Sequence, residues 1–368
     1  MSKVSKYSSI HYNSYLQLDK ILSAQDTKSQ IVFGKSAHEE TLFIIVHQVY
    51  ELWFKQINHE LYSIHDMFNQ HMVDERNLGV IVGRLDRVTT IMDLIVEQIK
   101  VMETMTPLDF LEFRSLLFPA SGFQSFQFRE LEVLLGLKKD KRHTYNNMPY
   151  QDVFNDERKQ KLKALEEGPS LRDLLEDWLE RTPFIDLDGF NFVEAYKAAV
   201  AKMVESEQNA IKNTDVLTDK YKEMRIKMVG DMSTYFASIW DPNHHAKLIE
   251  EGKASISYEA MVAALFINLY RDEPILQLPF QLLRKVVEID EGLAMWRYRH
   301  AQMVMKMLGN KIGTGGSSGH EYLNKTAQKH HIFSDLHSIS TLLIPRNYMP
   351  KLPPTVKENL GFHYKPKL

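Results

Sequence analysis

The stretch from His38 to Glu60, HEETLFIIVHQVYELWFKQINHE, decides how this chain folds. Its apolar side chains nearly encircle a helix, and a helix that is apolar on every side belongs in a protein core. Ser36 precedes it and Glu39 follows three residues later, a spacing typical of a capping box at a helix start. We therefore predict a long core helix that begins here and runs towards Met67.

His47 lies in the middle of this predicted helix and shares one face with Phe43 and Glu51. A titratable imidazole inside so apolar an element needs a hydrogen-bond partner or a chemical task. From this stretch alone both interpretations stay open: a core histidine bonded to a backbone carbonyl, or a functional residue.

The rest of the chain follows the helical period, and no strand alternation or internal repeat is visible. Apolar residues from Leu78 to Ile99 recur near helical spacing, and Thr106 with Pro107 suits a helix start. The sequence therefore predicts an all-α fold built from long core helices. Besides 38–67, helices are expected over 15–25, 74–102, 108–118, 123–137, 156–167, 171–180, 192–203, 205–240, 246–252, 257–270, 280–309, 321–329 and 333–343.

At 368 residues the chain can bury a sizeable core. We expect a single all-α domain over residues 36–343, preceded by an N-terminal segment, 1–35. The stretch 344–368 is rich in proline and lysine, and we predict that it is loosely attached.

The composition, with 25% charged and 44% hydrophobic residues, is that of an ordinary globular protein. The net charge of −3 gives no reason to expect binding to nucleic acid or to an anionic membrane. The absence of cysteine excludes disulfides, thiolate catalysis and cysteine-ligated zinc or iron–sulfur sites. The N-terminus lacks an apolar signal core, and no segment approaches the ~18 apolar residues of a spanning helix, so we expect a soluble cytoplasmic protein.

Fifteen histidines raise the question of a metal site. The adjacent pairs at 244–245 and 330–331 cannot both face one ion from a helix, so we predict surface residues there. His300 differs, because Trp296, Met303 and other apolar residues share its helical face. Such a face suits a haem iron, which takes a neutral imidazole. Spacing alone favours a structural histidine, so both interpretations stay open.

The glycine-rich segment GTGGSSG at 313–319 is not a phosphate-binding loop, because no GK[ST] follows it, and no strand precedes it as a dinucleotide fingerprint requires. Two interpretations remain. It is either a mobile loop whose amides and hydroxyls, including that of Thr314, bind a small polar group, or a plain flexible linker.

Three blocks of the sequence together resemble the tryptophan 2,3-dioxygenase family. They are HEETLFIIVHQVYELWFKQI at 38–57, TPLDFLEFR with PASGFQSFQFR at 106–129, and WRYRHAQMVMKMLGNKIGTGGSSGHEYL at 296–323. The likeness covers most of the chain in the right order, and the 145–290 region looks like the longer, animal-type form with a helical insertion. The resemblance implies an all-α homotetramer, a dimer of dimers, with one haem b per subunit. It also implies that O2 is inserted across the indole C2–C3 bond of L-tryptophan to give N-formyl-L-kynurenine, the first step of the kynurenine pathway.

The resemblance also implies roles for particular residues. His300 matches the axial ligand of the haem iron, and His47 matches the catalytic, substrate-binding histidine beside the indole N–H, with Phe43 as the ring wall one turn earlier. Arg114 matches the arginine that grips the substrate carboxylate, and Phe110 lies one turn before it.

Thr314 matches a threonine that holds the amino-acid end of the substrate. Tyr12 and Tyr15 match tyrosines that reach into a neighbouring subunit's site, which gives segment 1–35 its expected role.

The residue chemistry agrees with these roles. Arg114 and Phe110 are four residues apart, so one helical face offers a planar guanidinium for a carboxylate beside an apolar wall. Phe43 and His47, also four apart, suit an indole ring and its N–H if the histidine is neutral. Two alternatives stay open: a haem-binding sensor or helical scaffold that has lost catalysis, and an indoleamine-type dioxygenase with a broader substrate range.

Overall fold

The computed structural model describes residues 10–70, 73–138, 150–187, 189–309, 311 and 319–361. Within these residues the chain is helical except for two short antiparallel strands, β1 (Asp186–Leu187) and β2 (Phe190–Asn191), so the all-α prediction is confirmed. None of the helices in the described ranges is both long and apolar enough to cross a membrane. The helices are α1 (Tyr12–Leu16), α2 (Leu18–Leu22), α3 (Lys28–Phe33), α4 (His38–Phe68), α5 (Leu78–Met102), α6 (Pro107–Arg114), α7 (Phe126–Leu135), α8 (Asp156–Glu167), α9 (Leu171–Glu180), α10 (Phe192–Lys212), α11 (Asp219–Phe236), α12 (Pro242–Glu250), α13 (Tyr258–Leu269), α14 (Gln277–Leu308), α15 (Gly319–Lys329), α16 (Ser334–Leu342) and α17 (Pro354–Leu360).

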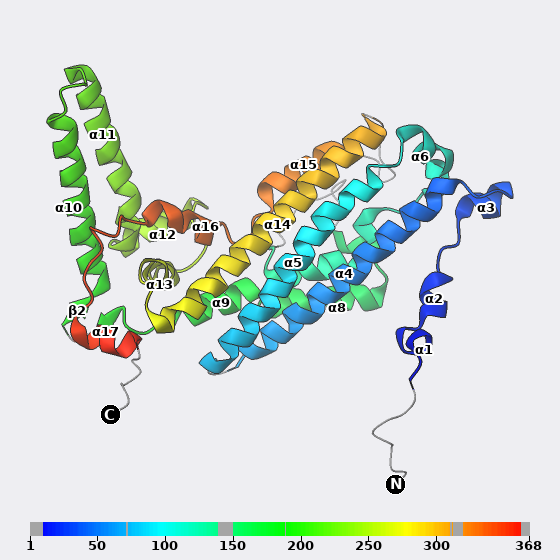
Figure 1. The fold of residues 1–368 in the computed structure, drawn as a ribbon, viewed down its shortest axis with the longest axis horizontal. Coiled ribbons are helices and arrows are strands. Elements are labelled where there is room, and N and C mark those ends of the chain that lie inside the picture. Colours follow the sequence, from blue (N-terminus) through cyan, green and yellow to red (C-terminus); the bar gives the residue numbers. More distant parts are fainter. Residues whose placement is uncertain are drawn as a thin grey trace, which may run out of the picture.

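Three long helices, α4, α5 and α14, form the body of the molecule, and α5 packs against both of the others (Figure 1). Their contact faces carry fully buried side chains such as Leu61 on α4, Leu85 on α5 and Leu293 on α14. Gly292 allows α14 to approach α5, because a side chain there would come within 3.1 Å of Met92 Cβ. α7 and α9 pack on α4, while α15 packs on α14.

Helix α4 differs from its prediction at its start and on one face. Ala37 occupies the N-cap position without a side-chain bond, so the predicted capping box is wrong, and Ser36 Oγ donates instead to Thr27 Oγ1 at 3.1 Å. Ile45 and Leu52 are 43% and 52% exposed. The helix is therefore not buried on every side, because α5, α7 and α9 cover only part of its circumference.

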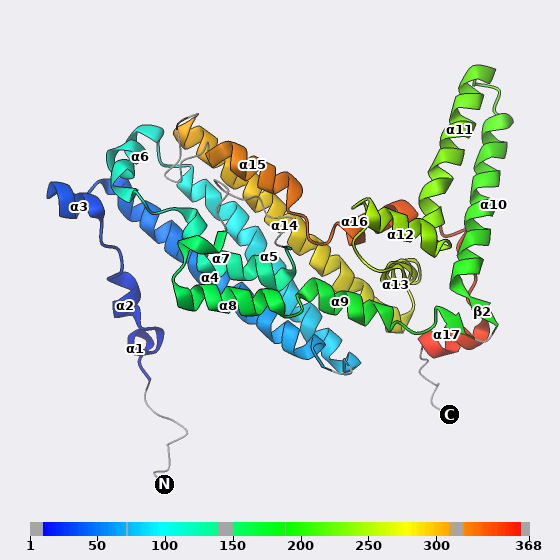
Figure 2. The same ribbon diagram turned by 180° about the vertical axis from the view of Figure 1, so that it is seen from behind.

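A helical hairpin, α10 with α11, projects from the end of the body where α13 lies (Figures 1 and 2). The prediction of one helix over 205–240 is wrong, because the chain leaves α10 after residue 212 and re-enters a helix at residue 219. The reversal lets Ile211 on α10 and Val229 on α11 become buried, at 8% and 6% exposure. An apolar stripe on a long helix can be covered in this way only if the helix folds back on a partner.

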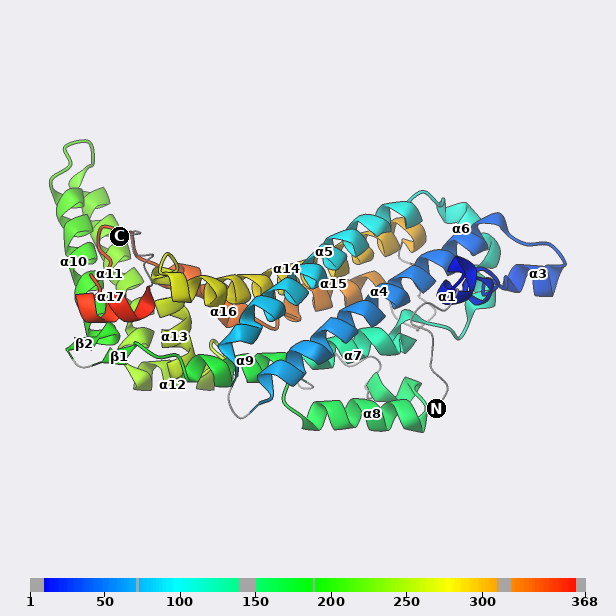
Figure 3. The ribbon, with the colours of Figure 1, turned by 60° about the horizontal axis from the view of Figure 1, so that its bottom comes forward.

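At the other end of the body the chain begins with three short helices, α1, α2 and α3 (Figure 3). The single helix predicted over 15–25 is wrong. Gln17 adopts a left-handed conformation, with φ 53° and ψ 41°, and separates α1 from α2. A continuous right-handed helix cannot pass through such a residue.

The C-terminal stretch packs on the fold, so the prediction that it is loosely attached is wrong for residues 344–361. Val356 and Leu360 on α17 are 1% and 0% exposed. The Tyr270 hydroxyl donates to the Pro350 carbonyl at 2.9 Å, and the Tyr348 hydroxyl donates to Ser206 Oγ at 2.8 Å. Pro354 begins α17 in this stretch, and the apolar residues of that helix are buried against the rest of the fold.

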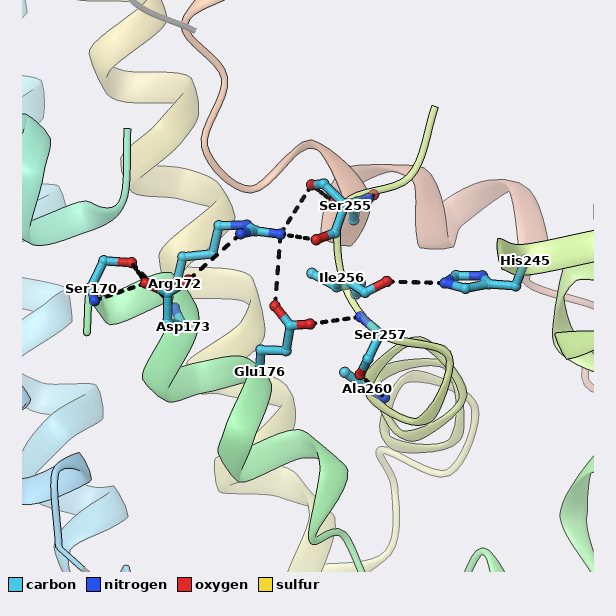
Figure 4. Close-up of polar contacts among 10 residues, drawn as sticks. Ser170, Arg172, Asp173, Glu176, His245, Ser255, Ile256, Ser257 and Ala260 are labelled. Atoms are coloured by element: carbon cyan, nitrogen blue, oxygen red, sulfur yellow. Dashed lines mark hydrogen bonds and ion pairs between the residues drawn. The ribbon is translucent and has the colours of Figure 1, made fainter. Parts of the chain in front are cut away.

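A buried polar network ties α9 to the chain that enters α13 (Figure 4). The Arg172 guanidinium donates to the carbonyl and hydroxyl oxygens of Ser255. One turn further along α9, the Glu176 carboxylate accepts from the Ser257 amide at 2.7 Å. These bonds fix the α13 half of the molecule to a helix that also packs on α4.

The two adjacent histidine pairs do not both lie at the surface as predicted. His245 is 2% exposed, and its Nε2 donates to the Ile256 carbonyl at 3.0 Å (Figure 4). His330 is also 2% exposed, whereas its neighbour His331 is half-buried. Adjacent residues point in different directions, so one member of each pair faces the interior even in a polar run of sequence.

Candidate active site

A cavity of about 1040 Å³ lies between α2, α4, α6, α7, α14 and α15. Cavities that hold drug-sized ligands span roughly 300–1,000 Å³, so this one has room for a large cofactor together with a small substrate. His47 and His300 both line it. The two histidines belong to one site, although they lie 253 positions apart in the chain.

His300 lies in the last third of α14, and its ring is tilted against that of Trp296 with centroids 5.3 Å apart. Burial lowers its pKa to about 4, and the nearby His47 contributes to the lowering. The ring is therefore neutral at neutral pH. Its buried Nδ1 atom has no hydrogen-bond partner among the residues that the structure describes.

His47 is held by its own helix. Its Nδ1 lies 2.7 Å from the Phe43 carbonyl oxygen, and because a carbonyl only accepts, Nδ1 carries the hydrogen. In the neutral ring Nε2 is then an acceptor. Burial lowers the pKa of His47 and outweighs the Phe43 bond, which acts in the opposite direction. The interpretation of a histidine bonded to a backbone carbonyl is therefore confirmed, and the same residue also lines the cavity.

Aromatic rings surround His47 on the α4 and α6 side of the cavity. The Phe43 ring lies 4.2 Å from the His47 ring, and the Phe110 ring stacks on Phe43 with centroids 5.7 Å apart. Phe113, 0% exposed, packs edge-on against both phenylalanines at 5.6 and 5.4 Å. The result is a flat apolar slot beside one hydrogen-bond acceptor.

Arg114 ends α6, one turn after Phe110, and both residues line the cavity. The helix starts with Pro107 and a capping box in which Thr106 and Asp109 bond each other's backbone amides. That cap satisfies amides at the helix start, and so fixes the helix that presents the guanidinium beside the aromatic slot.

The remaining predicted site residues lie elsewhere. Tyr12 and Tyr15 on α1 are 75% and 73% exposed, and neither lines the cavity in the part of the chain that the structure describes. Thr314 lies outside the described residues. The structure thus brings together His47, His300, Phe43, Phe110 and Arg114, and leaves the two tyrosines apart.

A buried charged cluster lies on the cavity wall, and none of its members is among the site residues predicted from the sequence. Glu132, 1% exposed, pairs with Arg129 at 2.7 Å and with Arg297 at 2.8 Å, and Arg297 also donates to the His330 carbonyl at 3.1 Å. All four residues line the cavity. One sequence signal could have found them: Arg129 and Glu132 stand three apart in an otherwise apolar helix, and Arg297 lies three residues before His300.

The N-terminal segment also contributes to this cavity. Residues of the stretch 20–28, including Ile21 and Ala24, line the same cavity as His47. The family resemblance implies a role for this segment in a neighbouring subunit.

The sequence model of the family described as Tryptophan 2,3-dioxygenase matches residues 2–343. A Bdellovibrio bacteriovorus protein named tryptophan 2,3-dioxygenase is 46% identical over 98% of this chain and 100% of its own length. A Dictyostelium discoideum protein of the same name is 45% identical over 96% of this chain and 88% of its length. The zebrafish, Danio rerio, protein named tryptophan 2,3-dioxygenase B is 44% identical over 94% and 85%. The chain therefore belongs to the tryptophan 2,3-dioxygenase family.

Proposed function

We propose that this chain is a haem-dependent dioxygenase that inserts O2 across the indole C2–C3 bond of L-tryptophan and forms N-formyl-L-kynurenine. The observation that carries the proposal is one cavity lined by a neutral, partly buried His300, a carbonyl-bonded His47, an aromatic wall and Arg114. Family membership supports the same activity.

The residues present fit a haem. His300 is neutral, and its Nδ1 atom has no hydrogen-bond partner in the described part of the chain. Its imidazole would therefore serve as a nitrogen ligand of the haem iron. When bound, one haem per subunit supplies the iron chemistry that activates O2.

The protein's own residues then orient the substrate. Phe43 and Phe110 form the slot for the indole ring, and the unprotonated Nε2 of His47 accepts a hydrogen bond from the indole N–H. Arg114 binds the substrate carboxylate. Thr314 remains a prediction for the amino-acid end of the substrate. In this scheme the protein supplies geometry and a dry environment rather than a general base.

We also propose a homotetramer, a dimer of dimers, in which Tyr12 and Tyr15 reach a neighbouring subunit's cavity. Two observations support that role: the tyrosines are 75% and 73% exposed, and neither is among the residues that line the cavity of its own chain. The cytoplasmic location expected from the sequence remains a prediction.

An absorption spectrum of the purified protein, with and without L-tryptophan, tests the proposal. We expect a Soret band, a spectral change on addition of L-tryptophan, and oxygen-dependent formation of N-formylkynurenine. A protein that binds haem and tryptophan without turnover would instead be the sensor, and one that binds neither would be the scaffold.

Substrate comparison separates this enzyme from a broader indoleamine-type dioxygenase. Tryptamine lacks the carboxylate that Arg114 binds in this scheme, and hydrogen bonds to a charged group are worth about 1.5–3 kcal/mol. We therefore expect kcat/KM for tryptamine to be roughly 10- to 100-fold below that for L-tryptophan. Equal values for both compounds would contradict the assigned role of Arg114.

A further inference from the structure

Two polar residues of α4 stand on either side of the substrate-facing pair Phe43 and His47. Glu40 lies three residues before Phe43, and Gln48 directly follows His47, so all four belong to one broad helical face. All four line the cavity. Neither Glu40 nor Gln48 has a part in the proposed reaction, yet both are bonded to the chain's own N-terminal segment.

Gln48 holds the first part of that segment. Its Nε2 donates to the Ala24 carbonyl at 2.8 Å, and its Oε1 accepts from Gln25 Nε2 at 2.8 Å. Gln25 Nε2 also donates to the Ile21 carbonyl at 2.7 Å. One glutamine on α4 is thus linked to three residues of the segment, two of which, Ile21 and Ala24, line the cavity.

Glu40 holds the second part. It is 1% exposed and accepts from the Lys28 amide at 2.7 Å, from the Ser29 amide at 3.0 Å and from the Ser29 hydroxyl. Ser29, also 1% exposed, accepts from the Ala37 amide at 2.8 Å. A buried carboxylate with three donors is a well-satisfied anchor, and such an anchor fixes its partners in one position.

The two anchors define a wall, residues 20–28, that runs along α4 beside Phe43 and His47. Its upstream limit is marked by Gln17, whose left-handed conformation turns the chain between α1 and α2. Residues beyond that turn, including Tyr12 and Tyr15, are exposed. The segment is thus divided: 20–28 belongs to this chain's own cavity, and 10–16 does not line it.

We propose that Gln48 is a positioning residue for substrate binding: it holds residues 20–28 of its own chain against the His47 end of the cavity, where they form part of the wall of the site. This rests on the proposed function only in naming L-tryptophan as the ligand. A closed, dry site strengthens the hydrogen bond at His47 and the ion pair at Arg114, because charges and dipoles interact more strongly when water is excluded.

The test compares Gln48→Met with Gln56→Met. Both replace a glutamine of α4 by an apolar side chain of similar length. Gln56 bonds Glu60 on its own helix at 2.6 Å and is not among the residues that line the cavity, so it is the matched control. Gln25→Met, a change outside the cavity lining, removes the partner on the wall itself.

The first measurement is hydrogen exchange of residues 18–29 in the full-length protein without tryptophan. We expect faster exchange in Gln48→Met and Gln25→Met, and unchanged exchange in Gln56→Met. Because this readout needs no catalysis, it stands even if the proposed function fails. Unchanged exchange in both wall variants would overturn the role of Gln48 as an anchor.

The second measurement separates KM from kcat for L-tryptophan. Loss of one or two net hydrogen bonds of the wall corresponds to a rise in KM of roughly tenfold, with kcat within about twofold and an unchanged Soret band. A fall in kcat alone, or a KM equal to that of Gln56→Met, overturns the proposal. If the parent protein turns over no tryptophan, calorimetric affinity for L-tryptophan takes the place of KM, with the same two outcomes.

Discussion

At the residue scale, two histidines of the same cavity carry different tasks. His300 has a buried Nδ1 atom without a partner among the described residues, and His47 is already bonded to the Phe43 carbonyl. His300 is therefore suited to take a ligand from outside the chain, whereas His47 is suited to orient one.

Alanine substitution should separate these tasks. We expect His300→Ala to lose its haem and its Soret band, because alanine offers the iron no nitrogen ligand at this position. His47→Ala should keep its haem and lose roughly tenfold in kcat/KM, the worth of one hydrogen bond to the indole N–H. Haem content and steady-state rates check both, and complete inactivity of His47→Ala with haem intact would show that it is required rather than helpful.

The lowered pKa of His300 makes the haem-free protein sensitive to acid. Its folded pKa of about 4 lies below the unfolded value of 6.5, so between these pH values the unfolded state binds more protons. Stability from this residue is complete above pH 6.5 and is lost as the pH falls, by about 2 kcal/mol at pH 5. Urea unfolding of the apoprotein at pH 7.5 and 5 should show this loss, and His300→Phe should reduce it. An equal loss in both proteins would mean that other groups are responsible.

At the element scale, α6 is a short helix whose position depends on its start. The capping box of Thr106 and Asp109, with Pro107, fixes the helix that carries Phe110 and Arg114. The capping box of α9, made by Ser170 and Asp173, has the same chemistry but lies away from the cavity lining.

This pair of caps allows a controlled experiment. Thr106→Ala and Ser170→Ala should each lower the free energy of unfolding by about 1 kcal/mol, the usual worth of an N-cap side chain. Only Thr106→Ala should also raise KM for L-tryptophan, because fraying of α6 displaces Arg114. If the two variants have the same KM, the cap of α6 has no bearing on substrate binding.

Helix boundaries show how much of the fold the local sequence pattern predicts. The predicted bounds of α8 and α9 are confirmed, because capping residues and apolar period agree there. The run 205–240 is predicted as one helix but forms two, because the turn between them contains neither proline nor glycine and only its Asn, Thr and Asp residues mark the reversal. The capping box predicted at Ser36 is likewise wrong, because the Ser36 hydroxyl donates to Thr27 Oγ1 and Ala37 takes the N-cap position, with its amide donating to Ser29 Oγ.

At the scale of the whole molecule, the divided N-terminal segment links the fold to assembly. Residues 20–28 wall their own cavity, while Tyr12 and Tyr15 are exposed and are assigned to a neighbour. Exposed apolar residues on α4, such as Ile45 and Leu52, leave surface for subunit contacts.

Mixed assemblies test whether a tyrosine acts across subunits. Tyr15→Ala and Arg114→Ala should each be poorly active alone. Co-expressed, they should regain part of the activity, because some sites then combine an intact Arg114 with an intact Tyr15 from a neighbour. Mass measurement by light scattering should give four chains per particle. If no activity returns on mixing, the tyrosine acts within its own chain or not at all.

The amino-acid sequence by itself determined the helical class, most helix positions and the residue types of the site, because helical period and capping act over a few neighbouring residues. Only the tertiary structure decided which residues meet. It brought His47 and His300 into one cavity, buried His245 and His330, and placed Glu132 between two arginines. Burial and charge pairing depend on which helices cover one another, and contacts between residues far apart in the chain leave no periodic trace in either segment.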